Sequence, residues 1–190
     1  MAVFCSASQA AVIFSDNFDA NSYGLNTVPT GWTVTNGTVD IIGAGTPFNL
    51  CGSGYGKCID LDGTSMDAGI LSTSLNLTAG VQYTASFELA GNQRGGADTG
   101  TVSFGGLSFG SQSLAFALNA TDVFSTYQLV FTPGASGAYS LSFSNAGGDN
   151  IGALLDNVSV SAVPEPETLA MLLAGLGLVG AVARRKSKAA

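Results

Sequence analysis

The most constraining feature of the sequence is an alternation of apolar and polar side chains with a period of two. Throughout residues 81–89 every odd position is apolar and every even position is polar. Successive side chains of a β-strand point to opposite faces, so this alternation predicts a strand with one buried face. The residues expected on that face are Val81, Tyr83, Ala85, Phe87 and Leu89.

The same pattern recurs along the chain and predicts the fold class. Residues 126–132 and 138–144 also alternate, the second with Tyr139, Leu141 and Phe143 inward. Shorter strands are predicted at residues 12–18, 38–42, 58–61, 70–77, 101–104 and 154–160. Many short half-buried strands separated by Gly- and Asn-rich turns, without an amphipathic helix, indicate an all-β fold, an antiparallel β-sandwich. A jelly roll of roughly eight or nine strands fits best.

Charge is distributed very unevenly along the 190 residues. Charged residues make up 10% of the chain, His is absent and the net charge is −7. Up to residue 163 the only basic residues are Lys57 and Arg94, against eleven carboxylates. Nucleic-acid binding needs clustered Lys and Arg for phosphate contacts, so we expect no nucleic-acid partner.

The N-terminal segment, residues 1–11, is interpreted as the remnant of a signal peptide. It is apolar and then small, and Ser8-Gln9-Ala10 is similar to a signal-peptidase cleavage site. The charged start and the full apolar run of such a peptide are missing, so an ordinary apolar N-terminus remains the alternative.

Two cysteines close together predict a disulfide. Cys51 and Cys58 are separated by a stretch that includes several Gly and Ser residues, and an exported chain meets an oxidising compartment. A metal pair or a redox pair is less favoured, because there is no His or second Cys pair and the spacing differs from C-x-x-C.

The C-terminal segment, residues 163–190, predicts a single transmembrane helix. Pro164 and Pro166 end the last strand, and fifteen apolar or small residues then run from Leu169 to Ala183. With Thr168 included, the helix is expected at residues 168–183; its apolar run is about 22 Å long, short for a bilayer core of about 30 Å. The basic cluster at residues 184–188 should stay cytoplasmic, which leaves the body, residues 12–162, exported across the inner membrane.

This tail closely resembles the PEP-CTERM sorting signal of Gram-negative bacteria. The resemblance rests on residues 163–170, on the Gly-interrupted apolar run, and on the basic residues Arg184, Arg185 and Lys186. It implies that an exosortase recognises Pro164, Glu165 and Pro166, removes the helix, and releases or attaches the body at the cell surface. A plain C-terminal membrane anchor is the alternative.

The body resembles carbohydrate-binding-module-like jelly rolls. The resemblance is carried by residues 14–19, by Gly31-Trp32 and by residues 154–160, and it covers about residues 12–162. It implies a structural Ca²⁺ held by Asp19 and Asp156, with Asp16, Asp60 and Asp62 as alternates.

The alternation itself places Asp156 on one face with Leu154, Val158 and Val160, a face expected to be buried. An ionised carboxylate there needs a cation or hydrogen bonds, so a carboxylate bonded to backbone amides is the alternative to calcium.

An exopolysaccharide or other glycan is the expected partner of the exported body, and sugar binding needs aromatic platforms, for which Trp32 and Tyr55 are candidates because of their Gly- and Asn-rich settings. Tyr23 is a third candidate, and a lone Trp in the core is the alternative for Trp32. We expect a non-enzymatic surface or matrix protein, because no catalytic His or nucleophile motif is present. A carboxylate-dependent glycoside hydrolase using Glu88, or an adhesin or assembly subunit, are the alternatives.

Overall fold

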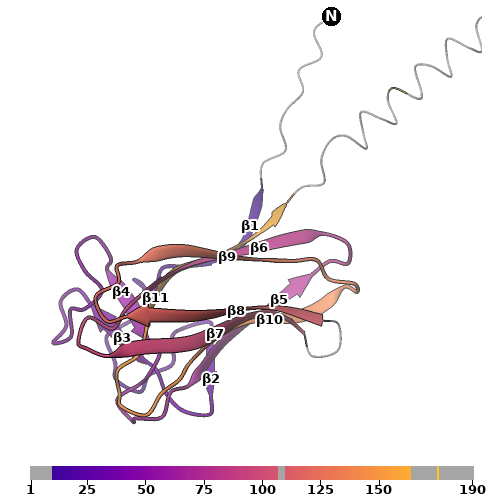
Figure 1. Ribbon diagram of the computed structural model, residues 1–190. Helices are drawn as coiled ribbons and strands as arrows, with labels where there is room; N and C mark the ends of the chain where they lie inside the picture. Colours follow the sequence, from indigo (N-terminus) through magenta and orange to yellow (C-terminus); the bar gives the residue numbers. More distant parts are fainter. Residues whose placement is uncertain (1–9, 107–109, 164–174, 176–190) are drawn as a thin grey trace, which may run out of the picture.

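The computed structural model describes residues 10–106, residues 110–163 and Gly175. Within these residues the chain forms two stacked β-sheets (Figure 1). The strands are β1 (Ala11–Asp16), β2 (Thr33–Thr35), β3 (Asp40–Gly43), β4 (Lys57–Asp60), β5 (Ile70–Leu77), β6 (Gln82–Ala90), β7 (Ala97–Gly106), β8 (Gly110–Asn119), β9 (Ser125–Phe131), β10 (Gly137–Asn145) and β11 (Leu154–Val163).

All strand pairs within the two sheets are antiparallel. The six-stranded sheet has the order β3-β4-β11-β6-β9, and β1 also pairs with β11; the five-stranded sheet has the order β2-β5-β10-β7-β8. The predicted antiparallel β-sandwich is therefore confirmed. The described residues contain two strands that the sequence analysis did not predict, β2 and β8, which together form the two edges of the five-stranded sheet.

The inner faces of the two sheets form the main core. Tyr83, Ala85, Phe87 and Leu89 of β6 are buried there, and Val81 packs against it, as their alternation predicted. From the opposite sheet, Tyr139, Leu141 and Phe143 of β10 are buried as predicted. The Phe87 and Phe143 rings meet edge to face, with centroids 5.1 Å apart, an arrangement that contributes about 0.5–1.5 kcal/mol beyond burial.

The two ends of the sandwich domain lie side by side (Figure 1). Ala11, the first residue of β1, pairs with Ala162 near the end of β11. The last strand continues to Val163, the residue before Pro164. The predicted sorting residues Pro164, Glu165 and Pro166, the basic cluster and all of the predicted transmembrane helix except Gly175 lie outside the described residues.

The described part of the chain includes no helix long and apolar enough to span a membrane. It does include the predicted disulfide: Cys51 and Cys58 are bonded, with their Cα atoms 5.9 Å apart. This bridge closes the loop between β3 and β4, called here the disulfide loop (residues 44–56).

Candidate functional site

The outer face of the five-stranded sheet carries rows of hydroxyl groups. Alternation buries Leu71, Val102, Leu141 and similar residues, so the polar positions between them face outward. Register aligns one such position from each strand into a single row, called here the hydroxyl row: Thr33, Ser72, Ser142, Ser103 and Ser113. Neighbouring strands lie about 4.8 Å apart, so the row offers a hydroxyl at about that interval across the sheet.

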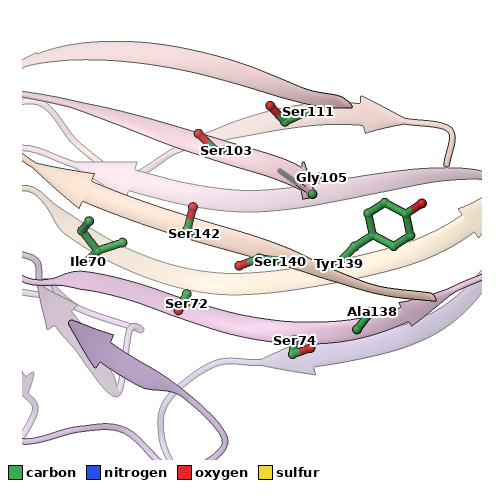
Figure 2. A pocket seen from close by; sticks show the side chains of 11 residues that line it. Ile70, Ser72, Ser74, Ser103, Gly105, Ser111, Ala138, Tyr139, Ser140 and Ser142 are labelled. Carbon is green, nitrogen blue, oxygen red and sulfur yellow. The ribbon is translucent and has the colours of Figure 1, made fainter. Parts of the chain in front are cut away.

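An open groove of about 600 Å³ runs over this face (Figure 2). A second aligned set, Ser74, Ser140, Gly105 and Ser111, lines it beside the hydroxyl row. Gly105 has a φ of 149°, and a Cβ at this position would come within 2.5 Å of the Ser111 Cα. The groove floor is therefore kept free of larger side chains here.

The lining limits what the groove can do chemically. Its serine hydroxyls can both donate and accept hydrogen bonds. Tyr139 contributes to the lining, but its ring is buried and its hydroxyl donates to the Ala135 carbonyl over 2.6 Å. No carboxylate or amine lines the groove among the described residues. The groove therefore fits a neutral, polyhydroxylated ligand and offers no general acid or base for hydrolysis.

The predicted glycan contacts do not lie in this groove. Trp32 is only 6% exposed; its ring packs among Phe14, Phe18 and Phe143, and its Nε1 donates to Asp16 Oδ2 over 2.8 Å. The prediction that Trp32 contacts a glycan is wrong, because the core covers the ring. Tyr23 is 37% exposed and is absent from the groove lining.

Tyr55 lies in the disulfide loop, half-buried. Its ring stacks on Phe124 with centroids 4.2 Å apart. This pair packs against a small apolar cluster of Ile42, Cys51, Cys58, Ala90 and Leu154, separate from the main core. A glycan contact at Tyr55 stays a prediction.

The structure corrects the predicted position of Asp156. Leu155, Val158 and Val160 belong to the main core, whereas Leu154 belongs to the small cluster under the disulfide loop. Asp156 lies opposite Glu88 on β6, at a bulge in the strand pairing where Asn157 adopts a φ of 49°. The extra residue reverses the alternation, so Asp156 is on the outer face and not on the face of Val158 and Val160.

Asp156 is nevertheless only 2% exposed, because loops cover this part of the outer face. Its carboxylate accepts a hydrogen bond from the Asn157 amide over 2.6 Å. Burial, and then the negative charges of Asp19, Glu88 and Asp16, raise the pKa of Asp156 to about 7, while the Asn157 amide lowers it. Burial also raises the pKa of Tyr55, and Glu88 and Asp156 add to that rise.

The surrounding carboxylates test the predicted calcium site. Asp19 accepts hydrogen bonds from the Lys57 amide (2.7 Å) and from Asn17 Nδ2 (2.9 Å). Asp16 accepts from the Phe18 amide and from the Trp32 indole. The oxygen donors of Asp19 and Asp156 suit calcium chemically. However, no group of three or more His, Cys, Asp or Glu in the described residues could hold a metal ion, so calcium stays a prediction.

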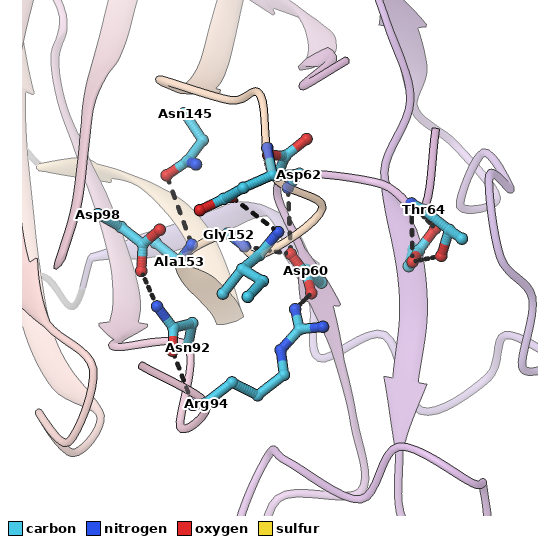
Figure 3. A network of polar contacts seen from close by, with 12 residues as sticks. Asp60, Asp62, Thr64, Asn92, Arg94, Asp98, Asn145, Gly152 and Ala153 are labelled. Atoms are coloured by element: carbon cyan, nitrogen blue, oxygen red, sulfur yellow. Dashed lines mark hydrogen bonds and ion pairs between the residues drawn. The ribbon is translucent and has the colours of Figure 1, made fainter. Parts of the chain in front are cut away.

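The alternates Asp60 and Asp62 belong to a separate polar network (Figure 3). Asp60 pairs with Arg94 and accepts hydrogen bonds from the amides of Asp62 (3.1 Å) and Gly152 (2.9 Å). Burial raises the pKa of Asp60, and the Arg94 guanidinium opposes that rise. Asp62 accepts from the Gly148 amide over 3.1 Å. These carboxylates hold the loop between β10 and β11 against β4.

Comparisons with known proteins found matches to the C-terminal segment and to the β-sandwich. Residues 162–186 match the family model described as the PEP-CTERM protein-sorting motif. No curated protein matches the chain.

Several solved structures share the sandwich fold. The CBM22-1 xylan-binding domain of Paenibacillus barcinonensis Xyn10C is 14% identical with a TM-score of 0.56, over 85% of this chain and all of that domain. TmCBM61, solved with β-1,4-galactotriose, is 17% identical with a TM-score of 0.50, over 72% of this chain and 90% of that one.

The K1 cleaved adhesin domain of Lys-gingipain from Porphyromonas gingivalis W83 is 14% identical with a TM-score of 0.50, over 80% of this chain and 98% of that domain. At such identities the likeness concerns the fold alone. The chain is therefore a β-sandwich with the fold of carbohydrate-binding modules, and it carries a PEP-CTERM protein-sorting motif at residues 162–186.

Proposed function

We propose that this protein is an exported, non-catalytic glycan-binding protein that an exosortase sorts through its C-terminal segment. The observation that carries the proposal is the open groove over the five-stranded sheet, lined by aligned serine hydroxyls. The fold shared with carbohydrate-binding modules supports the same function.

The charge of the body favours a neutral glycan. Up to residue 163 the chain carries eleven carboxylates and two cations, so an anionic polysaccharide would be repelled. The groove itself has no charged lining residue among those described. A neutral polysaccharide can exchange hydrogen bonds with the hydroxyl row without displacing a charge.

The carboxylates of the chain do not favour a hydrolase. Glu88 and Asp156 lie opposite each other, but Asp156 is almost fully buried. Glu88 accepts a hydrogen bond from Asn157 Nδ2 over 2.8 Å. A glycosidase needs two carboxyl groups that flank a bound sugar, and Asp156 is too deeply buried to contact one.

Export is supported by two separate features. The PEP-CTERM motif is a sorting motif, and the Cys51–Cys58 bridge is typical of proteins that mature in an oxidising compartment. In the proposed route the C-terminal segment anchors the chain in the membrane until an exosortase acts near Pro164, Glu165 and Pro166. The body then remains at the cell surface or outside the cell.

Affinity electrophoresis in neutral polysaccharide gels tests the binding site. Ser142→Trp fills the middle of the groove and should abolish retardation of the protein. Gln128→Trp adds the same ring to an exposed position of β9 in the other sheet and should leave retardation unchanged. Equal retardation of both variants would show that the glycan binds elsewhere.

Intact-mass measurement of protein from the native host tests the sorting. We expect a mature chain that ends near Pro164. A mature chain that ends at Ala190 contradicts processing and leaves the binding experiment unaffected.

A further inference from the structure

A second, smaller pocket lies under the disulfide loop on the outer face of the six-stranded sheet. Its volume is about 100 Å³. Asp40 and Ile42 of β3 and Asp60 of β4 form its floor, and Phe48 and Leu50 of the disulfide loop form one wall. The remaining lining residues come from three other loops: Thr64, Arg94 and Asn150. This pocket is called here the loop pocket. It lies on the opposite sheet from the groove lined by Ser72, Ser103, Ser140 and Ser142, which is called here the serine groove.

The carboxylates of the loop pocket are already engaged. Asp40 accepts hydrogen bonds from the Asn26 amide (2.7 Å), the Thr64 amide (3.1 Å) and Thr64 Oγ1 (2.6 Å). Asp60 accepts from two amides and from Arg94. Both side chains are at least 96% buried. The floor therefore holds its shape without a ligand and offers little to a hydrogen-bond donor.

Arg94 is the cationic donor of the loop pocket that remains open to a ligand, beside the amide of Asn150. Its Nη2 donates to Asp60, and its side chain is 27% exposed. A guanidinium has five N–H donors, and Nε and Nη1 of Arg94 have no partner among the described residues. A ligand in the loop pocket must therefore supply a hydrogen-bond acceptor to Arg94.

The acceptor should be neutral and should carry a small apolar group. Asp60 is paired with Arg94, and Asp40 is a further carboxylate that lines the pocket without a cationic partner, so an anionic acceptor would be repelled by Asp40. Ile42, Phe48 and Leu50 provide an apolar wall next to the guanidinium. The volume accommodates one small organic group or a few waters but not a whole sugar ring.

We propose that the loop pocket binds the acetyl group of an acetylated sugar. The carbonyl oxygen accepts hydrogen bonds from Arg94, and the methyl group packs against Ile42, Phe48 and Leu50. The acetyl group can come from an N-acetylated or an O-acetylated sugar, since both present a neutral carbonyl beside a methyl group.

Saturation-transfer NMR on the full chain in detergent micelles tests this proposal. The probes are triacetylchitotriose, cellotriose without acetyl groups, and O-acetylated xylotriose before and after alkaline de-esterification. We expect the acetyl methyl protons to receive more saturation than the ring protons. We also expect the acetylated probe that binds to do so about tenfold more tightly than its unacetylated counterpart, the discrimination typical of one small apolar group in a pocket.

Two pairs of variants locate the site. Phe48→Ser replaces the one aromatic side chain of the apolar wall by a polar one and should abolish the methyl saturation, whereas Phe48→Leu should keep it. Arg94→Lys keeps the charge beside Asp60 but loses the free guanidinium donors, and should weaken binding about tenfold. Ser142→Trp blocks the serine groove and should leave the methyl saturation unchanged.

Binding of triacetylchitotriose alone assigns the pocket to N-acetylated sugars, and binding of the esterified xylotriose alone assigns it to O-acetylated ones. Failure of every acetylated probe to bind, equal saturation of methyl and ring protons, or full binding by Phe48→Ser would overturn the proposal. A loss of methyl saturation in Ser142→Trp would assign the acetyl group to the serine groove and overturn it as well.

Discussion

The outer faces of the two sheets are built in opposite ways. The five-stranded sheet leaves an open face of hydroxyl-bearing and small side chains. The six-stranded sheet places Asp60, Asp156 and Leu154 on its outer face and covers them with loops. The disulfide, the Asp60–Arg94 ion pair and the Tyr55–Phe124 stack all occur in this cover.

The difference follows from the cost of exposing or burying each side chain. A serine hydroxyl in a strand hydrogen-bonds to water, so the open face needs no cover and remains available to a ligand. Apolar residues on an outer face are stabilised when loops cover them and exclude water. A carboxylate that is covered together with them must then accept hydrogen bonds or bind a cation. One face thus lies open to an extended ligand, and the other is stabilised by loops between which only the small loop pocket remains.

Removing the disulfide should have the largest effect on this comparison. Cys51→Ser with Cys58→Ser frees an eight-residue loop, and chain entropy predicts a loss of about 2.5 kcal/mol of unfolding free energy. Urea unfolding followed by tryptophan fluorescence measures this loss, since Trp32 is buried in the core.

The same double variant should bind an unacetylated neutral polysaccharide normally in conditions where it is folded. Loss of binding by the folded variant would contradict the separation of the covered face from the binding face.

Asp156 should make the covered face sensitive to pH. Its pKa is about 7 in the folded protein and near 3.8 when unfolded, so between these values the folded state holds a proton that the unfolded state releases. Stability should therefore fall as pH rises from about 4 to about 7 and stay level above that range. Asp156→Asn should be more stable than the native protein at pH 8, by on the order of 1–2 kcal/mol.

Thermal unfolding at several pH values, with a chelator present, checks the predicted fall in stability with rising pH. Asp67→Asn is a suitable control, because the side chain of Asp67 is exposed in the loop between β4 and β5. An Asp156→Asn variant that loses stability at pH 8 would show that the native carboxylate is held by a favourable partner.

Calcium, if it is that partner, should reverse the effect of ionised Asp156. At tenfold excess over its dissociation constant it adds about 1.4 kcal/mol to the unfolding free energy. The rise in melting temperature should be larger at pH 8 than at pH 5, because the ionised carboxylate is the ligand. Asp19→Asn should diminish the rise and Asp67→Asn should leave it unchanged; no response to calcium at pH 8 excludes the predicted site.

The fold was predictable where alternation was unambiguous and not elsewhere. The predicted strand at residues 70–77 matches β5, and the predicted inward face of β6 is the observed one. β8 was missed because its outer face carries Ala115 and Ala117 instead of polar residues. Together with Leu114, Phe116 and Leu118 they form one continuous apolar run, in which no alternation with a period of two is visible. β2 has only three residues, too few for a period to be recognised.

The candidate sites were less predictable than the fold. A bulge cannot be read from alternation, so the face of Asp156 was assigned wrongly. Three serines of the hydroxyl row, Ser72, Ser103 and Ser142, occupy polar positions of predicted strands, but their alignment depends on strand order and register, which one sequence does not specify. For Trp32 the sequence left both a glycan contact and a core position open, because composition cannot separate a buried ring from one at the edge of a binding groove; the structure places it in the core.

The smallest effect on stability should come from the open face itself. Ser103→Ala with Ser142→Ala removes two neighbouring hydroxyls of the hydroxyl row and should change the unfolding free energy by less than about 0.5 kcal/mol, as surface substitutions usually do. Polysaccharide affinity should nevertheless fall about fivefold to thirtyfold, since each lost hydrogen bond contributes about 0.5–1 kcal/mol. Ser86→Ala with Ser159→Ala is a matched control, because these serines pair in the same way on the other sheet. If both double variants bind equally well, the hydroxyl row does not contact the glycan, and the hydroxyl groups of the open face then hydrogen-bond only to water.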